Sequence, residues 1–213
     1  MKNIVYAYEE NPVLRGVNLR VMKGESVALY GSNGAGKSTL LKIINGLIFP
    51  INGSYKFEGK EITPKVMADN KFAKYFHQKI GFVWQNPDVQ LFCGSVEEEL
   101  AFGPEQMGLL TDEIKLRVND ALEFFGLNKL RHRAPYYLSG GEKKKTALAS
   151  VLTMNPTVWT LDEPLSALDE ETKQRLTEFL LELKRAGKTI IFSSHDSNFI
   201  SKIADRQLKL GGD

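Results

Sequence analysis

Residues Gly31 to Ser38 constrain this chain more than any other feature, because they read GSNGAGKS and match G-x-x-x-x-G-K-[ST]. In this pattern the glycines let a loop turn its backbone N–H groups inward around a phosphate. The apolar run before it, Ser26 to Tyr30 (SVALY), predicts a buried strand, and the residues from Lys37 on have helical spacing. A loop between a strand and a helix N-terminus is the setting in which the pattern binds phosphate. The loop therefore predicts a nucleoside triphosphate site.

The side chains of this loop have separate expected tasks. Lys37 places its ammonium between the β- and γ-phosphates, the Ser38 hydroxyl ligates Mg²⁺, and Thr39 lies near the α-phosphate. The full set of candidate nucleotide-binding residues here is Gly31, Ser32, Asn33, Gly34, Ala35, Gly36, Lys37, Ser38 and Thr39. The loop does not say which class of triphosphatase carries it.

The apolar pattern along the chain predicts an α/β fold with a parallel sheet and an inserted helical lobe. Further strands are expected over residues 54–57, 157–161 and 189–192, and helices over 170–186 and most of 96–154. The helix from Lys37 is expected to end near Asn45 and Gly46. Its expected apolar face is Leu40, Leu41, Ile44 and Leu47.

Two adjacent carboxylates follow the strand expected at 157–161, within Val158 to Pro164 (VWTLDEP). In a parallel sheet, ligands collect at the carboxyl ends of the strands. Asp162 is therefore placed to hold Mg²⁺. Glu163, one residue further on, is placed to act as general base on a water that attacks the γ-phosphate.

A second glycine pair opens another helix at Leu138 to Glu142, which reads LSGGE. The backbone N–H groups of Gly140 and Gly141 and the Ser139 hydroxyl form a second anion site. One nucleotide does not need two such loops far apart in one fold. A head-to-tail dimer does, with each γ-phosphate between one subunit's phosphate loop and its partner's LSGGE.

With these motifs, the chain resembles the nucleotide-binding subunits of ABC transporters over essentially its whole length. In that resemblance GSNGAGKST is the Walker A motif, LSGGE the signature and VWTLDEP the Walker B motif. Ser166 to Asp169 (SALD) resembles the D-loop, which contacts the opposite subunit and adds Asp169 to the site. Gln85 resembles the Q-loop glutamine, which senses Mg²⁺ and the γ-phosphate, and His195 the switch histidine. Tyr8 resembles the aromatic that stacks on adenine, with Tyr6 and Tyr30 as nearby alternatives.

The resemblance implies a P-loop ATPase fold with an antiparallel β subdomain, over a single domain of residues 1–213. It divides the chain into a catalytic core, 1–85 and 155–213, and a helical lobe, 86–154. It further implies ATP hydrolysis with Lys37, Gln85, Glu163 and His195 as catalytic residues, and Mg²⁺ held by Ser38, Gln85 and Asp162. The implied partners are a second ATPase subunit and a transmembrane coupling protein, which place the chain peripherally on the cytoplasmic side of the membrane.

Composition agrees with this expectation. The net charge is +2 from nearly balanced acids and bases, which argues against a dedicated nucleic-acid partner. Cys93 is the only cysteine, so no disulfide can form within the chain. The sequence contains no run of about 20 apolar residues that could span a bilayer.

The segment from Trp84 to Leu109 resembles energy-coupling factor (ECF) transporter ATPases, which power the uptake of vitamins and of cobalt or nickel ions. In that family the region after the Q-loop receives a coupling helix of the membrane partner. Gln90, Leu91 and Phe92 are the candidates for that surface, with core packing as the alternative for Phe92.

Three features depart from the family pattern. Glu142 stands where glutamine is usual, and Lys145 where arginine is usual. Many relatives carry a further C-terminal region that helps to dimerise, and here the sequence stops soon after Leu210. The alternatives are another ABC importer or exporter, a soluble ABC ATPase of DNA repair or translation, and a partner subunit that binds ATP without hydrolysing it.

Overall fold

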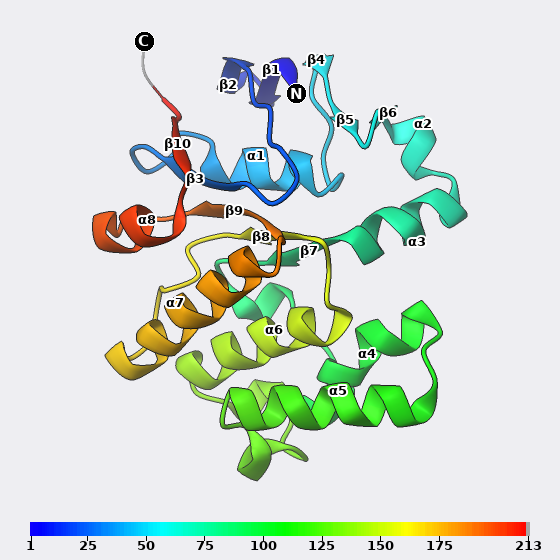
Figure 1. Cartoon of the computed structure of the whole chain (residues 1–213). Coiled ribbons are helices and arrows are strands. Elements are labelled where there is room, and N and C mark those ends of the chain that lie inside the picture. The colour runs from blue at the N-terminus through cyan, green and yellow to red at the C-terminus, as the bar shows by residue number, and fades with distance from the viewer. Residues whose placement is uncertain (212–213) are drawn as a thin grey trace.

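A five-stranded parallel sheet forms the centre of the computed structural model, which describes residues 1–211 (Figure 1). Its strand order is β10-β3-β9-β8-β7. The strands are β3 (Ser26–Tyr30), β7 (Ile80–Val83), β8 (Val158–Leu161), β9 (Thr189–Ser193) and β10 (Arg206–Lys209). The apolar runs that predict β3, β8 and β9 are thus confirmed. Each of these strands ends toward the same edge, which is where the phosphate loop and the carboxylates follow.

Helix α1 (Lys37–Ile44) packs between this sheet and a three-stranded antiparallel sheet of order β2-β1-β4 (Figure 1). The strands of the second sheet are β1 (Lys2–Tyr8), β2 (Asn11–Val17) and β4 (Asn52–Ser54). Successive strand residues point to opposite faces, so Val27 and Leu29 of β3 join the apolar side of α1 while Ala28 joins the core on the other face. The antiparallel β subdomain therefore shares one core with the phosphate-loop helix.

The other face of the parallel sheet is covered by α6 (Gly140–Met154), α7 (Glu170–Arg185) and α8 (Ser197–Ile203). Trp159 of β8 is fully buried there, and its ring meets Phe179 of α7 edge to face at 5.6 Å between centroids. Burial of aromatic surface is the main stabilising contribution in such a layer.

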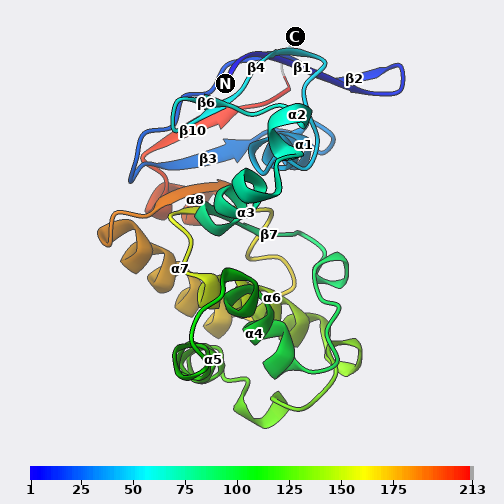
Figure 2. The ribbon, with the colours of Figure 1, turned by 90° about the vertical axis from the view of Figure 1, so that its right-hand side faces the viewer.

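A helical region lies between β7 and β8 in the sequence and forms the lower part of the molecule (Figure 2). It contains α4 (Val96–Met107), α5 (Thr111–Phe124) and α6, with 3₁₀ turns at Pro87–Val89, Asn128–Leu130 and Pro135–Tyr137. Ser95 caps α4 by accepting a hydrogen bond from the Glu98 N–H at 3.2 Å, and the first turn of α4 carries three glutamates. Both features stabilise a helix N-terminus.

The structure differs from the sequence prediction at two places. The strand expected at 54–57 is divided between β4 and β5 (Lys56–Phe57), and β5 pairs with β6 (Lys60–Glu61) instead of β1. Tyr55 separates them because its side chain turns into the core and its hydroxyl donates to the Ile44 carbonyl at 2.8 Å. Two helices then follow, α2 (Pro64–Met67) and α3 (Asn70–Lys79).

Leu47 does not lie on the apolar face of α1, contrary to expectation. The helix ends at Ile44, and Gly46, at φ 65°, turns the chain away. Leu47 is consequently 44% exposed. The prediction that the helix ends near Asn45 and Gly46 is thus confirmed, and the apolar spacing that extends to Leu47 does not prolong the helix.

Candidate active site

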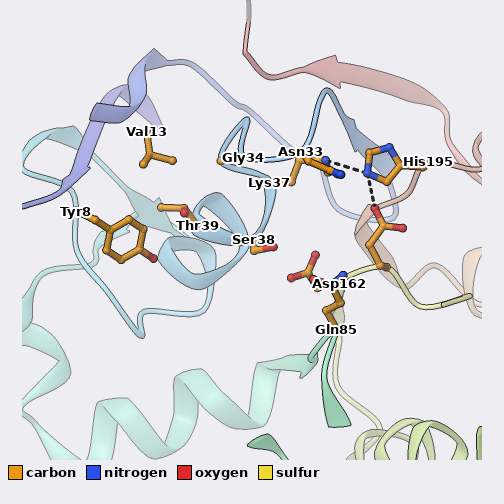
Figure 3. A pocket seen from close by; sticks show the side chains of 12 residues that line it. Tyr8, Val13, Asn33, Gly34, Lys37, Ser38, Thr39, Gln85, Asp162 and His195 are labelled. Carbon is orange, nitrogen blue, oxygen red and sulfur yellow. Dashed lines mark hydrogen bonds and ion pairs between the residues drawn. The ribbon is translucent and has the colours of Figure 1, made fainter. Parts of the chain in front are cut away.

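A cavity of about 470 Å³ lies at the carboxyl edge of the parallel sheet (Figure 3). It is lined by residues from segments far apart in the sequence: Tyr8, Val13, Asn33, Gly34, Gly36, Lys37, Ser38, Thr39, Gln85, Asp162, Glu163 and His195. All of these except Val13 are sequence-predicted site residues. Tyr8 and Val13 lie at one end of the cavity and His195 at the other, with Ser38 and Asp162 between them.

The phosphate loop depends on glycine at Gly36. This residue is the N-cap of α1 with φ 93°, and a Cβ there would lie 2.6 Å from Cδ2 of Leu14. Helix α1 has no side-chain cap and no acidic residue in its first turn, whereas α4, α6 and α7 have both. The N–H groups at the start of α1 therefore remain available to an anion in the cavity.

Lys37 is 8% exposed, and its ammonium donates to the carbonyls of Gly31 at 2.9 Å and Ser32 at 3.1 Å. Its Nζ also lies 3.3 Å from Nε2 of His195. The lysine thus joins the phosphate loop to the turn after β9. A fixed cation beside a row of free N–H groups is a strong phosphate site.

Asp162 and Glu163 are organised by Ser193, the last residue of β9. The Ser193 hydroxyl donates to Oδ1 of Asp162 at 2.6 Å and accepts from the Glu163 N–H at 2.9 Å. Asp162 is 4% exposed, and Glu163 has left-handed backbone geometry, with φ 45°. Sequence reasoning missed Ser193, although its position two residues before His195 at a strand end could have indicated it.

The Glu163 carboxylate faces the cavity with one oxygen free of hydrogen bonds. That oxygen, Oε1, is buried and lies 3.5 Å from Nε2 of His195. Burial raises the pKa of Glu163, and electrostatic interaction with His195 and Lys37 opposes this shift. A carboxylate with a raised pKa and an unused acceptor is suited to take a proton from a bound water.

The remaining predicted residues of the cavity come from three separate segments. Tyr8 is 44% exposed, with the ring of Tyr6 edge-on at 5.0 Å; neither Tyr6 nor Tyr30 lines the cavity. Gln85 follows β7 with an exposed side chain near Asp162. Oxygen donors from Ser38, Gln85 and Asp162 form the kind of set that suits Mg²⁺.

Several predicted site residues do not line this cavity. Gly31, Ser32 and Ala35 belong to the loop but are not among the residues that line the cavity. Ser139, Gly140, Gly141 and Asp169 lie on other elements. Ser139 caps α6 in a capping box with Glu142, and Asp169 caps α7 by accepting from the Thr172 N–H at 2.8 Å. Asp169 also lies 3.8 Å from Nζ of Lys145.

Gln90, a candidate for a partner surface, is engaged within the chain. Its Nε2 donates to the Ala147 carbonyl at 2.9 Å and the Ser150 hydroxyl at 3.2 Å, while its Oε1 accepts from the Trp84 N–H at 3.2 Å. Phe92, in contrast, is 67% exposed, so core packing does not explain it.

Lys144 also reaches this site, whereas the sequence places it only as positive charge near LSGGE, together with Lys143 and Lys145. It is 1% exposed, and its ammonium donates to the backbone carbonyls of Trp84 at 2.8 Å and Gln85 at 3.3 Å. Burial lowers the pKa of Lys144 to about 8, against the opposing charges of Asp162 and Glu163. One lysine among three consecutive lysines gives no sequence signal for burial of this kind.

A phosphate loop between β3 and α1, with two carboxylates at the end of β8, defines a P-loop nucleoside triphosphatase. The chain belongs to the ABC transporter family, whose family model matches residues 14–166. It is an ATP-binding and ATP-hydrolysing subunit of that family.

Relatives in both sequence and structure support this assignment. The chain is 45% identical to the nickel import ATP-binding protein LarO of Lactiplantibacillus plantarum, over 96% of this chain and 85% of that protein. It is 44% identical to the energy-coupling factor transporter ATP-binding protein EcfA of Methanothermobacter thermautotrophicus, over 97% and 65% of the two chains.

Two solved structures share the fold over 98% of this chain. One is cbiO1 from Clostridium perfringens, described as part of the ABC transporter complex cbiONQ, at 36% identity, TM-score 0.80 and 82% of that chain. The other is a dimeric ATP-binding cassette in a post-hydrolysis state bound to ADP and Pi, at 28% identity, TM-score 0.89 and 92% of that chain.

Proposed function

We propose that this chain forms half of two composite ATP sites and powers an ECF-type importer of a vitamin or a transition-metal ion. One observation carries the composite site. The cavity gathers residues of the Walker A, Walker B, Q-loop and switch motifs, whereas Ser139 and Gly140 are exposed on the helical region and do not line it. A partner subunit, identical or related, supplies its own Ser139, Gly140 and Gly141 to complete the site.

In this proposal the chain has two functional parts. Residues 1–85 and 155–213 form the catalytic core with its β subdomain, and residues 86–154 form the lobe that carries LSGGE. The support is that α4, α5 and α6 lie between β7 and β8 in the sequence and pack on one another. Asp169 follows Walker B and faces the partner subunit near that composite site.

The proposed roles follow from the contacts in the cavity. Lys37 and the N–H groups of the phosphate loop hold the β- and γ-phosphates, while Thr39 lies at the α-phosphate and Tyr8 stacks on adenine. Glu163 takes the proton of the attacking water at its free Oε1, and His195 contacts the γ-phosphate.

Mg²⁺ fits the oxygen donors of Ser38, Gln85 and Asp162, of which Asp162 is oriented by Ser193. The ion supplies charge neutralisation at the phosphates, which is the main requirement of phosphoryl transfer. The chain's contribution is to fix the donors in advance, so that little reorganisation is needed.

The transport role rests on the named relatives. A nickel import protein, EcfA and cbiO1 all appear among proteins similar to this chain over nearly its full length. None of the helices described within residues 1–211 has the length and apolar character needed to cross a bilayer. A transmembrane coupling protein is therefore proposed to anchor the chain to the cytoplasmic side of the membrane. Another ABC importer or an exporter is the second candidate.

The substitution Glu163→Gln tests the proposed general base. We expect ATP hydrolysis to fall by ~10² to 10⁴-fold, while ATP binding persists and an ATP-dependent dimer becomes visible by gel filtration. Undiminished turnover would show that another residue activates the water.

Adding Ser139→Arg to Glu163→Gln tests the composite site in the same experiment. The long, charged arginine side chain at the α6 N-cap blocks closure of the dimer. We therefore expect ATP to bind to a monomer and the ATP-dependent dimer to disappear. A dimer that persists with Ser139→Arg contradicts the sandwich arrangement.

A further inference from the structure

Lys144 is the most deeply buried charged side chain among the described residues. It lies on α6, five residues after Ser139, and is 1% exposed. Burial of an ammonium is costly unless every donor is used. Here the three N–H donors meet three backbone carbonyls: Trp84 at 2.8 Å, Gln85 at 3.3 Å and Asp162 at 3.5 Å.

The three carbonyls belong to two of the three segments that carry Mg²⁺ donors in the proposed site. Trp84 and Gln85 follow β7, and Asp162 follows β8. The Lys144 contact to the Asp162 carbonyl is at the limit of hydrogen-bond distance, so the stronger attachment is to the turn after β7.

A second contact holds the same turn from the other side. The Trp84 N–H donates to Oε1 of Gln90, whose Nε2 is bound to the Ala147 carbonyl of α6. Both backbone polar groups of Trp84 are thus tied to α6, the carbonyl by Lys144 and the N–H through Gln90. Gln85 itself keeps an exposed side chain that lines the cavity.

We propose that Lys144 is a positioning residue for ATP hydrolysis, whose ammonium fixes the backbone of Gln85 to the helix that begins at Ser139. The inference deepens the proposed function and rests on it. In this arrangement α6 begins at the LSGGE loop, which meets the partner's nucleotide. Further along, the same rigid helix holds Gln85, which senses the γ-phosphate of its own site. Closure of the partner's site is thereby transmitted to Gln85.

The test is a double-mutant cycle of Lys144→Met and Gln85→Ala, read as kcat and KM for ATP with thermal unfolding as the folding check. Lys144→Met keeps the length of the side chain and removes its donors. Loss of a buried charged hydrogen bond corresponds to a fall in kcat of roughly 10- to 100-fold. ADP affinity measured without Mg²⁺ is expected to stay within about two-fold, because Lys144 does not line the cavity.

In the Gln85→Ala background, the same change is expected to lower kcat by less than about three-fold, since residues that act through one another are not additive. Lys144→Arg is expected to restore most of the activity because its guanidinium donates to the same carbonyls. The matched control is Lys143→Met, the adjacent lysine of α6, which pairs with Asp88 at 2.7 Å and does not reach Trp84, Gln85 or Asp162. It is expected to behave as wild type.

Hydrogen exchange of residues 84–90 gives a readout that does not depend on turnover. Faster exchange there in Lys144→Met but not in Lys143→Met supports the proposal. Additive losses in the cycle, or unchanged kcat in a folded Lys144→Met protein, overturn it. If Lys144→Met does not fold, Lys144→Gln enters the same cycle under the same criteria. A Glu163→Gln protein that shows no ATP-dependent dimer instead overturns the composite site, which the cycle does not measure.

Discussion

At the scale of single residues, the Ser193 hydroxyl accounts for much of the geometry of the carboxylates. It binds the Asp162 side chain and the Glu163 backbone at once, and so connects the ends of β8 and β9. A non-glycine residue in left-handed geometry, such as Glu163, costs about 1–3 kcal/mol. That strain is retained at a residue that lines the cavity and keeps one carboxylate oxygen free of hydrogen bonds.

The raised pKa of Glu163 predicts a dependence of stability on pH. Because burial raises the folded-state pKa of this carboxyl, the folded chain holds its proton to a higher pH than the unfolded chain does. Glu163 therefore destabilises the nucleotide-free protein above that folded pKa, and the effect vanishes below the ordinary value of 4.5. We expect Glu163→Gln to raise the melting temperature at pH 8, with a gain that shrinks toward pH 4.5.

Thermal unfolding without nucleotide, followed across this pH range, checks the prediction. Glu170→Gln is a suitable control, since Glu170 is an exposed glutamate at the start of α7 with a side chain 89% accessible. An unchanged or lower melting temperature of Glu163→Gln at pH 8 contradicts the role of burial.

At the scale of elements, the start of α6 explains why glutamate is accepted at Glu142. The Ser139 hydroxyl accepts from the Glu142 N–H at 3.3 Å, and the Glu142 carboxylate accepts from the Ser139 N–H at 2.7 Å. A glutamine oxygen accepts the same bond, and a carboxylate adds a favourable charge at a helix N-terminus. The departure at this position thus preserves the local structure.

Glu142→Ala is expected to destabilise α6 because the Ser139 N–H loses its partner. Loss of a capping contact costs about 0.5–2 kcal/mol, which corresponds to a few degrees in melting temperature for a chain of this size. Glu142→Gln is the matched variant and is expected to melt close to wild type. Equal melting temperatures for the Ala and Gln variants contradict the capping role.

The sequence predicts the strands that are buried on both faces, such as Val27 to Leu29 and Trp159 to Leu161, because they read as continuous apolar runs. It does not predict β1 or β2, whose partly exposed residues mix polar and apolar types. It also misses β7, a buried apolar run of only four residues, Ile80–Val83. The order of the motifs along the chain predicts which of their residues belong to the site. Lys144, Ser193 and the inward turn of Tyr55 depend on tertiary contacts that local patterns do not encode.

At the scale of the whole molecule, an exposed aromatic pair is the candidate contact with the membrane partner. Phe92 and Phe102, 67% and 40% exposed, meet edge to face at 4.9 Å. The buried Glu99 carboxylate holds the loop in place by accepting from the N–H groups of Phe92 and Cys93 at 2.9 and 2.8 Å. An aromatic held in a fixed exposed position is typical of an interface residue.

Phe92→Asp is expected to lower the yield of the membrane protein that co-purifies with the chain in mild detergent by roughly ten-fold or more. The ATP-dependent dimer of Glu163→Gln is expected to persist. Leu116→Asp is the control, because Leu116 is 61% exposed and lies on α5, a different element from those that carry the aromatic pair. Recovery of a substrate-binding membrane protein together with a larger coupling protein supports the ECF type. Equal recovery of Phe92→Asp and wild type excludes this surface.

The order of strands in the parallel sheet has a consequence for how the protein is made. Strand β10 lies beside β3, and the Leu210 carbonyl closes against Gly31 so tightly that a Cβ there would clash with it. The first residue of the phosphate loop is therefore supported by a segment that is synthesised long after it. A nascent chain can form α1 early, but the loop lacks this support until residues 206–210 have emerged.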